Sequence, residues 1–493
     1  MREPDEKRNR LLPEGKGGEK GNAVMRFLRE FLYFPQKRPQ IQSYGQNLAE
    51  RYPDLTSQEV KQITSRDINP ASLMLLALFT GLLAGVAATL LKFGISGLSK
   101  FLTGLFRGND VNWWLILLPV VGIVLCGIFQ RYILHRQIFH GDDRLRHAFA
   151  MNKCYMPVSL TYNPLIACII TLGFGGSAGS EGPIAYSSAA IGSNLGAWFK
   201  VSPNKVKILT AIGAGAGIAG IFKAPIGGVM FTIEVIGIGL NTLAVAALVV
   251  ACVASAITAY LLSGCTPDIP FHHATPVTLD NFPLILLFGV ACGLYSCYYS
   301  GCMQMTGKWL GKLRNPWIKN VSAGLAIGLM IFCFPTLYGE GYGSVAQLLD
   351  GNWDNLATGG LFHGIGNHST LLLAVAFGTI AVKGFATAST NDGGGVAGDF
   401  APTIMVGSVV GFFYAYLLQT LCGIQLPVAD YVFLGMAGVL AGAVKAPLMA
   451  MFLITEMATM GYGQFAPVAI VATLSYLTVC LVNFIGRNLR RGR

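Results

Sequence analysis

The feature that most constrains this chain is a succession of apolar segments that are each long enough, or nearly so, to cross a lipid bilayer. Their ranges are Ala71–Phe93, Trp113–Phe129, Thr242–Leu262, Phe282–Tyr299, Val321–Leu337 and Phe465–Ile485. The hydrocarbon core of a bilayer is about 30 Å thick, which about 20 helical residues span. Of the 493 residues, 53% are hydrophobic and 12% are charged, which is typical of membrane proteins and excludes an ordinary soluble domain. We therefore predict an all-α polytopic membrane protein.

Two further apolar segments, Ile184–Leu195 and Ile208–Phe222, are shorter and rich in small residues. They predict tilted or half-spanning helices that pack inside the protein and not against lipid. The 61 glycines of the chain support such close approach between helices, because a helix without side chains on one face lets its neighbour come near.

The two ends of the chain differ in composition from the apolar part. Residues 1–67 carry 13 Lys/Arg and 10 Asp/Glu and lack the apolar region of a signal peptide. We expect this segment to be a cytoplasmic extension, residues 68–486 to form the transmembrane domain, and residues 487–493 to be a short basic tail. Basic residues at both ends predict that both termini are cytoplasmic. The net charge of +11 then reflects topology and contact with anionic lipids, not nucleic-acid binding.

The 11 cysteines lie mostly in apolar segments and form no C-x-x-C pair. This pattern favours buried, small hydrophobic side chains over metal ligands or disulfides. No Gly-Lys-Ser/Thr phosphate loop occurs. We expect no metal and no cofactor.

Two apolar segments repeat each other at an offset of 222 residues. The stretch "GAGAGIAGIFKAPIGGVMFTIE" (Gly213–Glu234) matches "GMAGVLAGAVKAPLMAMFLITE" (Gly435–Glu456), including Lys-Ala-Pro and the final glutamate. Before each copy stands a related pair, "GSEGP" (Gly179–Pro183) and "GDFAP" (Gly398–Pro402). Duplicated halves are typical of secondary transporters, whose substrate site lies near the bilayer midplane where the repeats meet.

Pro183 and Pro402 indicate where two helices begin inside the membrane, because proline is favoured in the first turn of a helix. The neighbouring Gly179, Ser180 and Gly398 belong to these expected helix starts. A helix start presents free N–H groups and a positive dipole end, which attract anions. Two such starts, one from each repeat, predict a pathway for an anion.

These motifs resemble those of the CLC family of chloride channels and chloride/proton antiporters. "GSEGP" is similar to its G-R/K-E-G-P motif and "GGGVAGDFAP" (Gly393–Pro402) to its G-G-x-F-x-P motif. "KGFATAST" (Lys383–Thr390), "GEGYGSV" (Gly339–Val345) and "KAPIGGVMFTIE" also resemble family segments. The resemblance covers roughly residues 70–485. It implies an inverted-repeat fold with many tilted and broken helices, the first repeat spanning about 70–265 and the second about 280–485.

The resemblance also implies a homodimer in which each subunit holds its own ion pathway for chloride, and for protons if it is an exchanger. Glu181 matches the glutamate whose carboxylate occupies an anion site and leaves it when protonated or displaced. The backbone amides at four positions match anion-binding positions: Gly182, Asp399, Phe400 and Ala401. The Asp399 side chain is unexpected beside an anion route, and we expect it to face the cytoplasmic or the protein side and cap backbone groups instead of lining the pore. The few residues after Ile485 leave no room for the nucleotide-binding domains of many eukaryotic members, so the resemblance is to the bacterial type and implies the inner membrane.

Three positions depart from the family pattern. His140, in "FHGDDRL" (Phe139–Leu145), stands where a serine usually contacts the central anion; either it donates to the anion or it is a solvent-facing loop residue. The C-terminal tyrosine of many members is absent, and Asn488 stands roughly in its place. Val235 occupies the position of the internal proton-transfer acid of exchangers, whereas Glu234 holds the preceding, structural position.

The sequence leaves the mechanism open between a voltage-gated-type chloride channel and a chloride/proton exchanger. A fluoride-selective transporter is an alternative, since the central serine and tyrosine are missing. A remote alternative is an intramembrane serine hydrolase that uses Ser177 or Ser180 in "GGSAGSEG". It would need a histidine on a facing helix, and the seven histidines fall in expected loops or helix edges. We therefore expect a transport protein and not an enzyme.

Overall fold

The computed structural model describes residues 69–105, 112–134, 155–237, 241–264, 269–271, 281–353, 356, 360–362 and 369–491. The expected N-terminal extension and the segment Phe139–Leu145 with His140 lie outside these described residues. The chain divides into two units, and the contacts described below all belong to the unit that spans Gln40–Val482.

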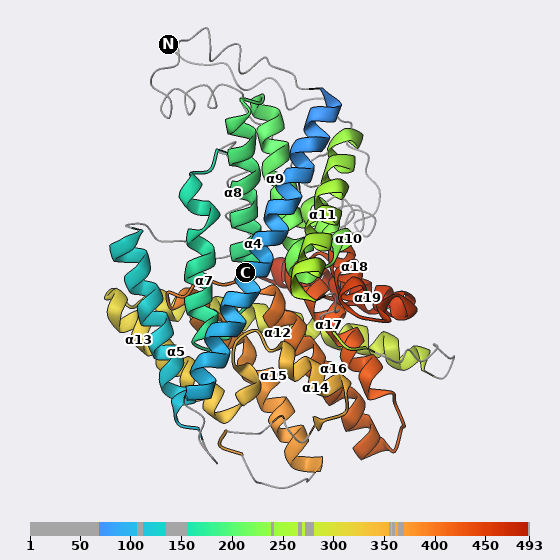
Figure 1. Ribbon diagram of the computed structural model, residues 1–493. Coiled ribbons are helices and arrows are strands. Elements are labelled where there is room, and N and C mark those ends of the chain that lie inside the picture. Colours follow the sequence, from blue (N-terminus) through green and yellow to red (C-terminus); the bar gives the residue numbers. More distant parts are fainter. Residues whose placement is uncertain are drawn as a thin grey trace, which may run out of the picture. The chain divides into compact units, whose positions relative to one another are not determined.

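The described part of the first half is helical (Figure 1). Its elements are α4 (Pro70–Leu105), α5 (Trp114–Ile128), η1 (Phe129–Ile133), η2 (Val158–Thr161), α7 (Asn163–Gly173), α8 (Glu181–Trp198), α9 (Pro203–Phe222), α10 (Pro225–Met230), η3 (Phe231–Ile236) and α11 (Thr242–Ser263).

The second half continues in the same way. Its elements are α12 (Phe282–Gly311), α13 (Pro316–Cys333), η4 (Pro335–Leu337), α14 (Tyr342–Leu349), α15 (Ser369–Asp392), α16 (Phe400–Cys422), α17 (Val428–Val444), α18 (Pro447–Met457), η6 (Gly461–Gln464) and α19 (Phe465–Arg491). Across the described residues of both halves, nine helical segments are long and apolar enough to cross a membrane. The prediction of an all-α, multi-pass membrane protein is confirmed.

Most of the expected apolar segments lie inside single helices, but α13 differs from its predicted range. The sequence predicts a span over Val321–Leu337, whereas α13 begins at Pro316 and ends at Cys333. Asn315 sets the start, because its side-chain oxygen accepts a hydrogen bond from the Trp317 amide at 2.9 Å and a proline follows it directly. Pro335 sets the end, since the residue before a proline is disfavoured in helical conformation.

Each half contains a pair of small-residue helices in close contact. In the first half α8 packs against α9 (Figure 1, green), and in the second half α16 packs against α17. Gly192 of α8 lies against the backbone of Leu209, and Gly411 of α16 lies against the backbone of Tyr431; a Cβ atom at either glycine would collide with it. The glycines that occupy matching places in the two repeats therefore make matching contacts.

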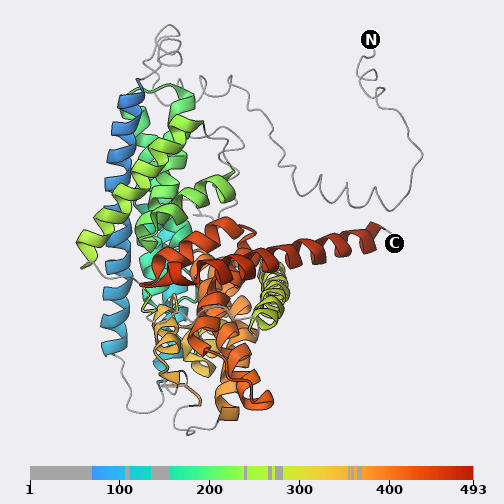
Figure 2. The same cartoon turned by 90° about the vertical axis from the view of Figure 1, so that its right-hand side faces the viewer.

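A second pair of contacts also repeats. Gly81 and Gly85 of α4 lie against the backbone of α11, and Gly289 and Gly293 of α12 lie against α19. Figure 2 shows α4 (blue) side by side with the green helices of the first half. Glycines four residues apart on one face let membrane helices approach closely, which replaces the missing hydrophobic driving force by van der Waals contact.

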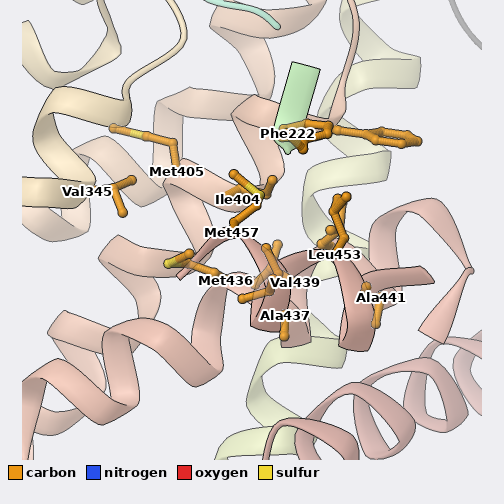
Figure 3. Close-up of a cluster of buried hydrophobic side chains, with 14 of the residues drawn as sticks. Phe222, Val345, Ile404, Met405, Met436, Ala437, Val439, Ala441, Leu453 and Met457 are labelled. Carbon is orange, nitrogen blue, oxygen red and sulfur yellow. The ribbon is translucent and has the colours of Figure 1, made fainter. Parts of the chain in front are cut away.

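A large apolar cluster joins the two halves (Figure 3). Ile404 of α16, Val439 of α17 and Leu453 of α18 are fully buried in it, together with Phe222, the last residue of α9. Because the first half contributes a large side chain to a cluster built mainly by the second, the two repeats share one core.

The Lys-Ala-Pro sequence shared by the repeats forms a turn between two broken helices. Lys223 directly follows α9 and Lys445 directly follows α17, both in the left-handed conformation with φ of 54° and 62°. Pro225 and Pro447 then begin α10 and α18. A left-handed residue ends a helix and a proline starts the next one without losing a needed N–H, so the motif breaks the helix at the same point in each repeat.

The glutamate that ends each repeated segment caps a helix of the other repeat. Glu456 accepts hydrogen bonds from the amides of Ile226 (3.1 Å) and Gly227 (2.8 Å), which begin α10. Glu234 accepts hydrogen bonds from the amides of Leu448 (3.4 Å) and Met449 (2.8 Å), which begin α18. The two bonds are related by the same offset of 222 residues, as an inverted repeat with a pseudo-two-fold axis requires.

Candidate functional site

The two repeats meet backbone to backbone at Gly179 and Gly398. The Gly179 amide donates to the Gly398 carbonyl at 2.9 Å, and the Gly398 amide donates to the Gly179 carbonyl at 2.6 Å. This isolated antiparallel bridge sets the starts of α8 and α16 side by side. A Cβ atom at Gly398 would come within 2.7 Å of the Gly182 amide nitrogen, so only glycine permits this approach.

The two helix starts are built alike. α8 begins at Glu181 after Ser180 (φ −92°, ψ −2°), and α16 begins at Phe400 after Asp399 (φ −110°, ψ −4°). The Ser180 side chain does not cap α8, and the Asp399 side chain does not cap α16. The first amides of a helix have no partner within the helix, so both starts present N–H groups and positive dipole ends at the junction.

The Glu181 carboxylate lies between these two helix starts. Its Oε1 accepts a hydrogen bond from the Ala401 amide at 2.6 Å, and the residue is 2% exposed. Its Oε2 is buried and has no hydrogen-bond partner among the described residues; it lies close to Gly179 and Gly398. A tethered carboxyl group therefore lies at the backbone amides of two helix starts, which is the kind of place that attracts anions.

Asp399 and Phe400 lie at the same junction but point into the protein. Asp399 Oδ1 accepts a hydrogen bond from the Asn391 side-chain amide of α15 at 2.6 Å, so this carboxylate pairs with a side chain and does not cap α16. The Phe400 ring is buried and packs edge-on against Phe231 at 5.8 Å between centroids. The backbone amides of both residues lie at the start of α16, where they have no hydrogen-bond partner within the helix.

Pro183 and Pro402 each occupy the third position of their helix. A proline there costs no hydrogen bond, because its N–H would have had no partner in the helix. Gly182, between Glu181 and Pro183, lies within van der Waals distance of the Gly398 backbone. The structure thus brings together all the expected helix-start residues.

Val235 is buried in the apolar core on η3 and is 2% exposed. An isopropyl side chain has no ionisable proton, so this position cannot relay protons.

His140 and the other six histidines all fall outside the described residues. Ser177 is fully buried, and the Ser180 hydroxyl donates to a carboxylate. Neither serine has the exposed setting that a hydrolase nucleophile needs.

Two charged residues near Glu181 were missed by sequence reasoning. Glu340, just before α14, accepts hydrogen bonds from the Ser180 amide at 3.1 Å and from the Ser180 hydroxyl. Lys383 of α15 is fully buried, and its Nζ donates to the Ser177 hydroxyl at 2.9 Å. Both residues interact electrostatically with Glu181. Both belong to segments that resemble the CLC family, Gly339–Val345 and Lys383–Thr390, but the sequence does not indicate that they lie near Glu181.

The fold and the junction define a duplicated, multi-pass membrane protein in which two helix starts converge on one buried carboxylate. A family model described as "Voltage gated chloride channel" matches residues 141–479, and the chain belongs to this family.

The relatives agree with this assignment. The chain is 26% identical over 418 residues to the voltage-gated ClC-type chloride channel ClcB of Salmonella typhi, covering 81% of this chain and 93% of that protein. It shares the fold of a slow cyanobacterial Cl⁻/H⁺ antiporter, with a TM-score of 0.70 at 22% identity over 87% of this chain and all of the other. A CLC-type fluoride/proton antiporter has the same fold, with a TM-score of 0.65 at 24% identity over 86% of this chain and 96% of the other.

Proposed function

We propose that this protein transports chloride across a membrane and that Glu181 is the gate of the pathway. The observation that carries the proposal is the bond between the Glu181 carboxylate and the Ala401 amide at the junction of two helix starts. The family and the chloride channel ClcB among the relatives support chloride as the anion.

The gate works by competition between two negative charges for one site. While Glu181 is ionised it accepts the amide hydrogen bond and excludes a free anion. Protonation removes its charge, and the neutral side chain holds the amides less strongly, because hydrogen bonds to an ionised acceptor are about twice as strong. Chloride then takes the amides of Ala401 and its neighbours, and the flux rises as the pH falls.

The proposal covers both a channel and a chloride/proton exchanger. Val235 excludes the usual second acid at that position, so proton exchange would have to use water or other side chains on the inner side. The test is made with purified protein in liposomes under a chloride gradient. Uphill proton movement indicates an exchanger, whereas brisk chloride flux without it indicates a channel. Absence of any chloride flux would contradict the proposal.

Fluoride is the alternative substrate, since the family contains a fluoride/proton antiporter of the same fold. The glutamate motif ends in Gly-Pro here, as in the chloride branch, which favours chloride. The same liposomes, loaded with fluoride in place of chloride, separate the two: faster loss of fluoride than of chloride would replace the proposed substrate.

The proposal also places the protein in a bacterial inner membrane as a homodimer, with residues 68–486 in the bilayer and both termini in the cytoplasm. The basic residues near both ends of the chain support this orientation. Cleavage of residues 1–67 by protease added outside intact cells would contradict it.

A further inference from the structure

Glu340 places a second carboxylate at the start of α8, beside the residue that carries the proposed gate. Its Oε1 accepts hydrogen bonds from both the amide and the hydroxyl of Ser180. Gly339 and Gly341 flank it with φ of 64° and 87°, a conformation that side chains disfavour. The turn before α14 is therefore shaped so that an acid reaches the amide of Ser180, the residue directly before α8.

The two carboxylates act on each other through space. Glu340 is hydrogen-bonded to Ser180, the residue directly before Glu181, which brings the two carboxyl groups near enough to interact electrostatically. Like charges repel more strongly in a buried setting than in water, because the effective dielectric constant is lower. The negative charge of Glu340 therefore makes the ionised, seated form of Glu181 less favourable.

Other groups also face Glu181, and their signs differ. From the neighbouring elements these are Lys383 of α15, Asp399 before α16, Cys168 of α7 and Tyr299 of α12. Lys223, at the end of α9, is directed to the Tyr260 ring of α11 at 5.2 Å, and Lys92 of α4 lies 6.0 Å from the Tyr342 ring, next to Glu340. Within this set the charged form of Lys383 has the opposite sign to the Glu181 carboxylate, whereas Glu340 and Asp399 have the same sign.

We propose that Glu340 is a positioning residue that sets how readily Glu181 leaves the anion site. It holds the start of α8 through Ser180, and its charge favours the protonated, released form of Glu181. The inference rests on the proposed function, because it assigns Glu340 a role in the gating of that same pathway.

A purely structural role would give a different result. Glu340→Gln keeps a side-chain oxygen that can accept the Ser180 hydrogen bonds, but it removes the charge. If Glu340 only caps the start of α8, the substitution changes stability slightly and leaves the pH dependence of transport unchanged. If its charge acts on Glu181, the pH dependence shifts.

The experiment measures chloride efflux from liposomes as a function of pH for the wild type, Glu340→Gln, Glu340→Asp and Asp350→Asn. Glu340→Gln is expected to reach half-maximal flux at lower pH. At the pH where the wild type is half-maximal, the flux of the variant should be up to about threefold lower than that of the wild type. Glu340→Asp keeps the charge and should stay near the wild type. Asp350→Asn removes an exposed carboxylate at the far end of α14 and is the matched control.

A second arm repeats Glu340→Gln in a Glu181→Gln background, where no further change with pH is expected. A Glu340→Gln profile that superimposes on the wild type overturns the inference but leaves the proposed function intact, provided that Glu181→Gln still alters the profile. A wild type without chloride flux overturns both. If Glu340→Gln does not yield folded protein, Glu340→Met gives a second neutral variant, and the same shift is expected.

Discussion

At the scale of single residues, the site depends on the balance of charges around one carboxylate. Glu181 accepts a hydrogen bond from the Ala401 amide, and Lys383 and Glu340 are nearby titratable groups whose charged forms act on it with opposite signs. A buried ammonium group is costly to keep in a membrane protein and usually marks a functional pathway. Lys383 is fully buried, and its Nζ donates to the hydroxyl of Ser177, four residues before Glu181.

Replacing Lys383 by methionine should therefore weaken anion transport without unfolding the protein. Methionine has a similar length but no charge and no hydrogen bond to Ser177; removing one partner of a buried polar pair is destabilising, so the melting temperature must be followed beside the flux. The loss of the amino group, and of the positive charge that it carries when protonated, should lower chloride flux roughly three- to tenfold. Flux from liposomes and the melting temperature are measured together, with the exposed Lys100→Met on α4 as control. A Lys383→Met variant with wild-type flux would show that the cation has no role in the pathway.

Sequence reasoning located some of these residues and not others, for a physical reason. Glu181 and Ala401 could be predicted because a glycine-proline helix start is a local signal, repeated in both halves. Glu340 and Lys383 could not, because their partners lie 160 and 206 positions away and no local pattern encodes such a distance. The pairing of Asp399 with Asn391 in place of a helix cap was missed because the sequence does not fix the direction of a side chain.

At the scale of elements, the fold depends on helices that end inside the membrane. Each such end leaves backbone groups without partners, which is costly away from water. The amides at the starts of α10 and α18 avoid this cost by donating hydrogen bonds to a carboxylate of the other repeat, Glu456 for α10 and Glu234 for α18. Polar groups at these breaks are therefore structural necessities as well as candidates for function.

Removing either cap should destabilise the protein to a similar extent. Glu456→Ala leaves the Ile226 and Gly227 amides without their acceptor, and Glu234→Ala does the same at α18. An unsatisfied buried donor costs about 1–3 kcal/mol. We expect both variants to melt several degrees below the wild type in detergent, whereas Asp350→Ala should not. A large loss in one variant and none in the other would contradict the equivalence of the two repeats.

The helices themselves were largely predictable, because apolar length is a strong local signal. The range of α13 was wrong since Lys319 and Asn320 interrupt the apolar run, although the cap at Asn315 and Pro316 begins the helix before them. The sequence also matched Glu234 with Glu456 and indicated a structural role for Glu234. It could not show that each caps the opposite repeat, because that follows from the placement of the repeats in space.

At the scale of the whole unit from Gln40 to Val482, the site belongs to neither repeat alone. The carboxylate comes from the first repeat and its amide partner from the second, and the Gly179–Gly398 bridge joins them. The shared apolar core and the exchanged caps hold the two repeats in this register. The same bonds that complete the fold therefore also assemble the proposed anion site.

The most direct test of this account is the pH dependence of chloride flux through Glu181→Gln in liposomes. Glutamine keeps the size of the side chain but can neither ionise nor compete as an anion for the Ala401 amide. The account predicts chloride flux that is at least as large as in the wild type and almost constant with pH, whereas wild-type flux rises as the pH falls. A Glu181→Gln variant that keeps the wild-type pH dependence would contradict the central claim that this carboxylate gates the pathway.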